Sequence, residues 1–138
     1  MLIIRCAIAL AALMTALAPA ANTYAQAADE ASTFVGTWRG ESVCVARNTA
    51  CHNETVVYRV TKLPDRSDDV SISADKIVNG NAINMGTLQF HYDHRLQSWV
   101  CQYPQGIWRL NVAGGKAEGT LTRADNTVFR HLTLRKDP

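Results

Sequence analysis

The cysteines are the residues of this chain whose type and spacing point most directly to chemistry. Six residues separate Cys44 from Cys51, and Asn48-Thr49 stands at the middle of that span. The span therefore predicts the reversal of a hairpin, closed by a disulfide between the two cysteines. Cys101 is then left over. It is interpreted either as a buried thiol that packs like a small apolar side chain, or as a site of intermolecular bridging or redox chemistry.

No other combination of residues predicts catalysis or metal binding. His91 and His94 are three positions apart at the end of an expected strand, where their side chains point to opposite faces, so they are not expected to share a metal. Cys101, Ser42 and Ser98 are candidate nucleophiles, but no Gly-x-Ser-x-Gly motif or recognisable triad accompanies them. We therefore predict a protein that is not an enzyme and that carries neither a metal nor another cofactor.

Arg130 is the residue that points most directly to a ligand. In the expected strand 128–136 it has the same parity as three apolar residues that should face inward. An inward guanidinium cannot lose its proton and needs a carboxylate. Glu41 and Glu118 have outward parity, so Arg130 lacks an obvious protein partner, and an anionic amphipathic ligand is proposed as its counter-ion. The alternative is the other register, with Phe129 inward and Arg130 in water.

The elements that must position these residues are short β-strands. Apolar and polar residues alternate in eight segments separated by turn signals such as Asn79-Gly80, and no segment has sustained helical periodicity. The expected strands are 36–45, 55–63, 69–78, 84–92, 98–103, 107–112, 117–122 and 128–136. Every connection is too short for a parallel crossover. The predicted fold is all-β, an eight-stranded antiparallel up-and-down barrel, with a two-sheet β-sandwich as the alternative.

Most aromatic residues fall on inward positions of these strands. An eight-stranded interior is either filled by side chains or large enough for one small ligand, so these rings form either a core or the wall of a pocket. The inward aromatic residues are Trp38, Phe90, Tyr92, Trp99, Tyr103 and Trp108. With Arg130, the predicted ligand-binding residues are Phe90, Tyr92, Trp99 and Trp108.

Residues 1–27 have the pattern of a secretory signal peptide. Arg5 precedes an apolar run over 6–17, and small residues follow up to the best cleavage site at 25–27. The apolar run is too short to span a bilayer, and no cysteine suited to a lipid anchor follows it. We expect residues 28–138 to be a single domain that is exported to the periplasm or outside the cell without a membrane anchor.

The start of the mature chain carries a family resemblance. The stretch 34–38 reads Phe-Val-Gly-Thr-Trp, and its Gly36 and Trp38 form a Gly-x-Trp at the head of the β-segments. This pattern resembles the calycins, which include the lipocalins and the fatty-acid-binding proteins. The resemblance implies a barrel that binds a small apolar molecule, with a basic residue of the last strand, Arg135 or Lys136, over the Trp38 indole. Fatty-acid-binding proteins have Arg-x-Tyr in that strand, where this chain has Arg130-His131-Leu132.

Two functions are consistent with these patterns. The first is an exported, non-enzymatic barrel that binds a small apolar or amphipathic ligand. The second is a protein-binding module such as a protease or lysozyme inhibitor, because the chain also resembles bacterial metalloprotease inhibitors, which insert an N-terminal segment comparable to Ala28–Thr33. It resembles, in addition, a group of small exported bacterial proteins with the Cys-x6-Cys hairpin. The chain has 14 basic and 12 acidic residues and no basic cluster, which argues against nucleic acid.

Overall fold

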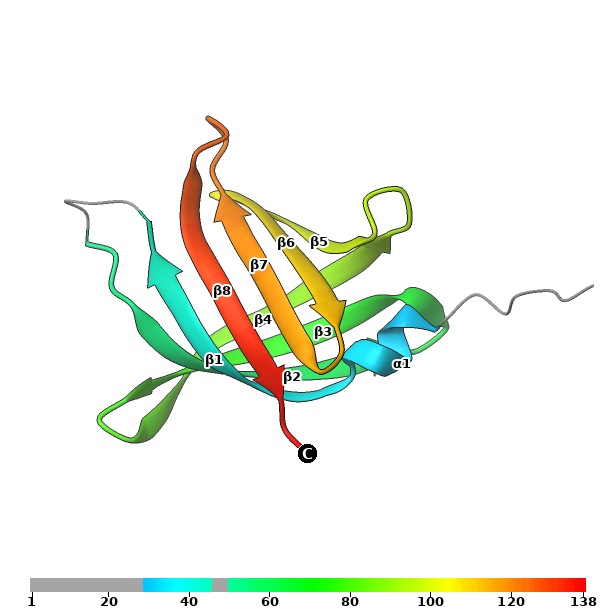
Figure 1. The fold of residues 1–138 in the computed structure, drawn as a ribbon, viewed down its shortest axis with the longest axis horizontal. Coiled ribbons are helices and arrows are strands. Elements are labelled where there is room, and N and C mark those ends of the chain that lie inside the picture. The colour runs from blue at the N-terminus through cyan, green and yellow to red at the C-terminus, as the bar shows by residue number, and fades with distance from the viewer. Residues whose placement is uncertain (1–28, 46–49) are drawn as a thin grey trace, which may run out of the picture.

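The computed structural model describes residues 29–45 and 50–138, and these form a closed barrel of antiparallel strands in the order β1 to β8 (Figure 1). The strands are β1 (Gly36–Cys44), β2 (Glu54–Leu63), β3 (Arg66–Val78), β4 (Asn81–Asp93), β5 (Ser98–Tyr103), β6 (Gly106–Ala113), β7 (Lys116–Thr122) and β8 (Val128–Lys136). The predicted fold class is confirmed, and the β-sandwich alternative is wrong. The expected signal peptide lies outside the described residues, as does Asn48-Thr49.

The β3–β4 hairpin is longer than the sequence predicted. Both turns that delimit β3 need only two residues, because Asp65 has φ 60°, and Asn79 and Gly80 have φ 51° and 79°. Positive φ values at the two central residues match the right-handed twist of a hairpin, so β4 can begin directly at Asn81. This hairpin provides one wall of the cavity described below.

A short helix, α1 (Glu30–Phe34), precedes β1 and was not predicted. Asp29, the N-cap residue directly before the helix, accepts hydrogen bonds from Ser32 and pairs with Lys62 of β2. Ala31 and Phe34 are fully buried. The helix therefore closes one end of the barrel. Of the segment expected to insert into a protein target, Ala31 is buried in the protein's own core, whereas Asp29, Ser32 and Thr33 are exposed.

The indole of Trp38 lies beneath this closure. Its Nε1 donates a hydrogen bond of 2.8 Å to the carbonyl of Phe34. Lys136 places its Nζ 5.6 Å from the centre of the Trp38 rings and donates a bond of 3.0 Å to the Thr33 carbonyl. Two carbonyls at the end of α1 are thereby satisfied. The cation over the indole is thus Lys136, whereas Arg135 is exposed on the outer face and does not have the role expected for it.

Gly36 is needed where the chain passes from α1 into β1. Its φ is +135°, and a Cβ at this position would lie 2.8 Å from Cε of Lys136. A larger residue would be strained in this conformation and would displace the lysine from Trp38. The Gly-x-Trp pattern therefore has a physical basis, since its glycine makes room for the cation that covers its tryptophan.

The barrel is filled at the α1 end. The ring of Trp99 lies 5.2 Å from that of Phe34 and 5.2 Å from that of Tyr92, and Trp38 is fully buried beside them. These rings, with the aliphatic residues around them, form the core. Among the described residues, no helix is long and apolar enough to cross a membrane.

The predicted disulfide joins Cys44 at the end of β1 to Cys51, with Cα atoms 6.0 Å apart. The bridge ties the segment before β2 to the end of β1. Cys101 is a free cysteine packed into the core, and burial raises the pKa of its thiol. Its surroundings are those of a packing residue, the first of the two interpretations.

Candidate ligand-binding cavity

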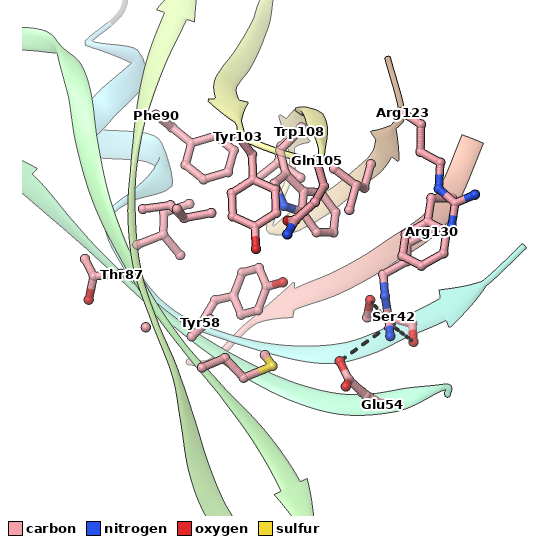
Figure 2. Close-up of a pocket in the computed structure, with 18 residues that line it drawn as sticks. Ser42, Glu54, Tyr58, Thr87, Phe90, Tyr103, Gln105, Trp108, Arg123 and Arg130 are labelled. Carbon is pink, nitrogen blue, oxygen red and sulfur yellow. Dashed lines mark hydrogen bonds and ion pairs between the residues drawn. The ribbon is translucent and has the colours of Figure 1, made fainter. Parts of the chain in front are cut away.

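The barrel is hollow at the end opposite α1, where a cavity of about 590 Å³ is lined by residues of every strand (Figure 2). Met85, Gln105 and Arg123 in its wall are exposed, so the cavity reaches the surface. The apolar wall consists of Ile72, Ala74, Met85, Leu88, Phe90, Trp108, Leu110, Leu121 and Phe129. The polar lining consists of Ser42, Glu54, Tyr58, Thr87, Tyr103, Gln105, Arg123 and Arg130.

The residues predicted to bind a ligand are divided between the two ends of the barrel. Arg130, Phe90 and Trp108 line the cavity. Tyr92 and Trp99 do not, because Trp99 packs against Phe34 of α1 and Tyr92 packs against Trp99 at the filled end. Alternation along a strand indicates which face a side chain occupies, but it does not indicate how deep in the barrel the side chain lies.

Arg130 faces inward and is held by several acceptors. Its Nη1 donates to Oγ of Ser42 at 2.9 Å and to the Ser42 carbonyl at 3.3 Å, and it lies 3.5 Å from a carboxylate oxygen of Glu54. Its Nη2 donates to the carbonyl of His52 at 2.9 Å. Only 13% of its side chain is exposed. The guanidinium thus connects β8 to β1 and to the segment that enters β2.

This arrangement corrects the expectation that an inward Arg130 lacks a protein partner. Glu54, the first residue of β2, is the partner, whereas the sequence-based prediction weighed only Glu41 and Glu118. Glu54 also lies 4.0 Å from Nζ of Lys76. Since its carboxylate already neutralises Arg130, the position of that arginine alone does not require an anionic ligand.

A β-bulge at the start of β8 turns two successive side chains into the cavity. Leu121 pairs with Arg130, whereas the next residue of β7, Thr122, pairs with Val128, so Phe129 is the additional residue. Phe129 and Arg130 both line the cavity as a result. From the sequence, either Arg130 or Phe129 was expected to face inward, but not both. The extra residue of the bulge breaks strict alternation, so both side chains face the cavity.

A second bulge shapes the opposite wall, in β4. Ala74 pairs with Gly86 and Asp75 with Asn84, so Met85 is the additional residue. The side chain of Asn84 donates to Asp75 at 2.9 Å and accepts from the backbone of Gly86 at 2.9 Å. Asp75 is itself buried against Arg59, whose guanidinium, together with Asn84, lowers the pKa of that carboxyl. This polar cluster fixes Met85 at the mouth of the cavity.

Three polar side chains point into the cavity without a hydrogen bond to any described residue. Figure 2 shows the hydroxyls of Tyr58 and Tyr103 and the amide of Gln105 directed inward. Burial, with Glu54 nearby, raises the pKa of Tyr58 to about 12, so its hydroxyl remains a donor at neutral pH. These groups can bind polar atoms of a ligand, and spacing in the sequence gave no signal that they would converge.

The histidines do not form a second site. His91 and His94 pair with Asp69 and Asp68, at 2.6 and 3.1 Å. Within the described part of the chain, no group of three or more His, Cys, Asp or Glu residues is placed to hold a metal ion. The cavity is therefore the feature from which a function can be argued.

Comparison with protein-family models gave no match, and comparison with curated proteins gave none. Among solved structures, the chain is similar to one described as the siderocalin Ex-FABP, which functions through dual ligand specificities. The TM-score is 0.49, the sequence identity is 12%, and the match covers 77% of this chain and 71% of the other. The closed up-and-down barrel and the last-strand cation over Trp38 are two features that the resemblance to calycins implied.

Proposed function

We propose that this protein is an exported, non-enzymatic barrel that binds a small amphipathic molecule in its cavity. The observation that carries the proposal is the cavity of about 590 Å³ at the end of the barrel away from α1. Its volume lies within the range of about 300–1,000 Å³ typical of small-molecule sites. The disulfide between Cys44 and Cys51 supports export, because such bridges persist in oxidising compartments.

The lining supports an amphipathic ligand over a purely apolar one. The apolar part of the lining includes the buried residues Leu110 and Phe90. The same cavity is also lined by the hydroxyls of Tyr58 and Tyr103 and by the guanidinium of Arg123. A purely apolar molecule would leave Tyr58 and Tyr103 without partners when it displaced water, which is unfavourable. A ligand with an apolar body and polar groups satisfies both parts of the lining.

The test combines a neutral fluorescent probe with a variant that fills the cavity. N-phenyl-1-naphthylamine should bind the parent protein with increased fluorescence. Ala74→Phe should abolish that signal, because Ala74 lines the cavity, whereas Ala113→Phe, at an exposed position of β6, should not. Native mass spectrometry of protein isolated from its source should reveal a retained small molecule. A parent protein that neither binds the probe nor retains a molecule would contradict the proposal.

The free edge of β4 favours a second candidate, a protein-binding function. β4 pairs with β3 from Asn81 onward but with β5 only through the three residues His91–Asp93. Within the described chain, 81–90 has a strand partner on one side only, and 81–87 is exposed. Such an edge can accept an extended peptide as an added strand. Peptides selected for binding should then protect β4 amides from hydrogen exchange and lose affinity for Gln89→Lys.

A further inference from the structure

The two arginines of the cavity differ in what they can still bind. The guanidinium of Arg130 is occupied by Ser42, His52 and Glu54. The guanidinium of Arg123 lies 4.1 Å from the centre of the Phe129 ring and forms no hydrogen bond or ion pair with another described residue. A guanidinium stacked on a ring retains N–H donors in its plane for a planar anion. Arg123 is therefore the arginine that is available to a ligand.

Asp125, whose carboxyl feels the charge of Arg123, forms no ion pair with it. Asp125 accepts hydrogen bonds from the backbone N–H and the hydroxyl of Thr127, at 3.0 and 2.6 Å. These bonds are the main cause of the lowered pKa of Asp125, and the charge of Arg123 contributes only in part. Deeper in the cavity, Glu54 is shared by Arg130 and Lys76. Counting these residues, the three positive charges of Arg123, Arg130 and Lys76 stand against two negative ones, and Arg123 is the cation that forms no ion pair with another described residue.

The remaining wall combines aliphatic, aromatic and polar side chains, and five of them are aromatic. The rings of Tyr58, Phe90, Tyr103, Trp108 and Phe129 face the same space. An alkyl chain would cover the tyrosine hydroxyls with groups that cannot hydrogen-bond, at a cost in free energy. A planar aromatic molecule with polar atoms on its edge stacks on the rings and also reaches those hydroxyls. The lining therefore discriminates between an aromatic acid and a fatty acid.

We propose that the cavity takes a planar aromatic anion, with its rings among the aromatic side chains and its anionic group bound by Arg123. This inference rests on the proposed function, because it names the ligand class of the same cavity. It assigns recognition of the anion to Arg123 and gives Arg130 a positioning role, in which it holds β8 in place so that Phe129 and Arg123 lie at the mouth.

The test uses two probes that differ only by an anionic group. 1-Anilinonaphthalene-8-sulfonate carries a sulfonate that N-phenyl-1-naphthylamine lacks. Arg123→Gln should weaken binding of the sulfonate probe about tenfold, the effect of losing one charge-assisted hydrogen bond. Binding of the neutral probe should change by less than about twofold. Arg109→Gln, the matched control at an exposed position of β6, should leave both affinities unchanged.

Each outcome identifies which part of the argument fails. If Arg123→Gln weakens neither probe, or both equally, the assignment of the anion to Arg123 is overturned while cavity binding stands. If the parent binds neither probe, the proposed function itself fails. Displacement of the neutral probe by 1-naphthoate and by undecanoate, acids with the same number of carbon atoms, tests the aromatic part. The naphthoate should be the stronger competitor, and the reverse order would overturn the aromatic class.

Discussion

Nη1 of Arg130 lies 3.5 Å from Oε2 of Glu54, so an ion pair on the inner face connects β8 to β2 across the intervening β1. Neither side chain is free in water, since 13% and 22% of their surfaces are exposed. The pair ties β8 to β2 at the end of the barrel that lacks the helix. At the other end of the barrel, Lys136 connects β8 to α1 and to Trp38 in a comparable way.

Removing one member of this pair should destabilise the fold. Arg130→Leu leaves Glu54 with only the more distant Lys76, and it leaves the hydroxyl of Ser42 and the carbonyl of His52 without their donor. We expect the free energy of unfolding in urea to fall by about 2 kcal/mol. The double variant with Glu54→Leu should recover part of this loss. Equal stability of the Arg130→Leu variant and the parent would show that the pair does not stabilise the barrel.

Trp38 should be among the most costly residues to truncate. It is fully buried, and its indole connects β1 to the end of α1. Trp38→Ala should lower the free energy of unfolding by about 3–5 kcal/mol, as other large-to-small core changes do. Trp38→Phe keeps a ring but removes the donor to Phe34, so it should cost less. A loss below about 1 kcal/mol for the alanine variant in urea melts would contradict the packing described here.

The three cysteines of the chain after residue 27 should behave differently from one another. Peptide mapping without reduction should recover Cys44 linked to Cys51. Cys101 should not react with 5,5′-dithiobis(2-nitrobenzoate) in the native protein, because it is buried and its thiol pKa is raised, and it should react in denaturant. Rapid modification of Cys101 under native conditions, or a disulfide that includes it, would show that Cys101 is not a free thiol buried in the core.

Acid should weaken the attachment of α1. The Lys62 ammonium, with Ser32, lowers the pKa of Asp29 from 3.8 to about 2. A carboxyl whose pKa is lowered on folding adds stability above its unfolded pKa and loses that contribution as the pH falls through the folded value. Asp29→Asn should therefore lower the Tm at pH 6 and have a smaller effect near pH 2, where about half of the Asp29 carboxyl groups are already protonated. High salt should reduce the effect, because the pair is exposed.

The sequence was sufficient for the strands but not for the helix or the depth of side chains. Period-two alternation and turn residues located all eight strands, since both depend on neighbours in the chain. α1 has only five residues, too few to establish a helical period. Lys136 shares its parity with the buried Leu132 and Leu134, so its position over Trp38 was within reach of the sequence. The location of Tyr92 and Trp99 at the filled end could not be predicted, because the sequence did not indicate which end of the barrel α1 fills.

The polar part of the cavity depended on features that alternation does not encode. The bulges at Phe129 and Met85 each add one residue and change which side chains face inward. Their positions are set by pairing with a neighbouring strand, which single-sequence patterns do not specify. Glu54 becomes the partner of Arg130 only because β1 brings the beginnings of β2 and β8 close together.

Because α1 with Phe34 and Trp99 fills one end of the barrel, the described part of the chain leaves the cavity open at the other end, beside Met85 and Arg123. A molecule must leave by the route through which it entered and cannot be threaded through the barrel. Such a molecule would pass Met85 and Arg123 both when it enters and when it leaves. If a molecule binds in the cavity, its rate of escape should depend on the residues at this opening. Substitutions beneath α1 should then change folding stability without changing that rate.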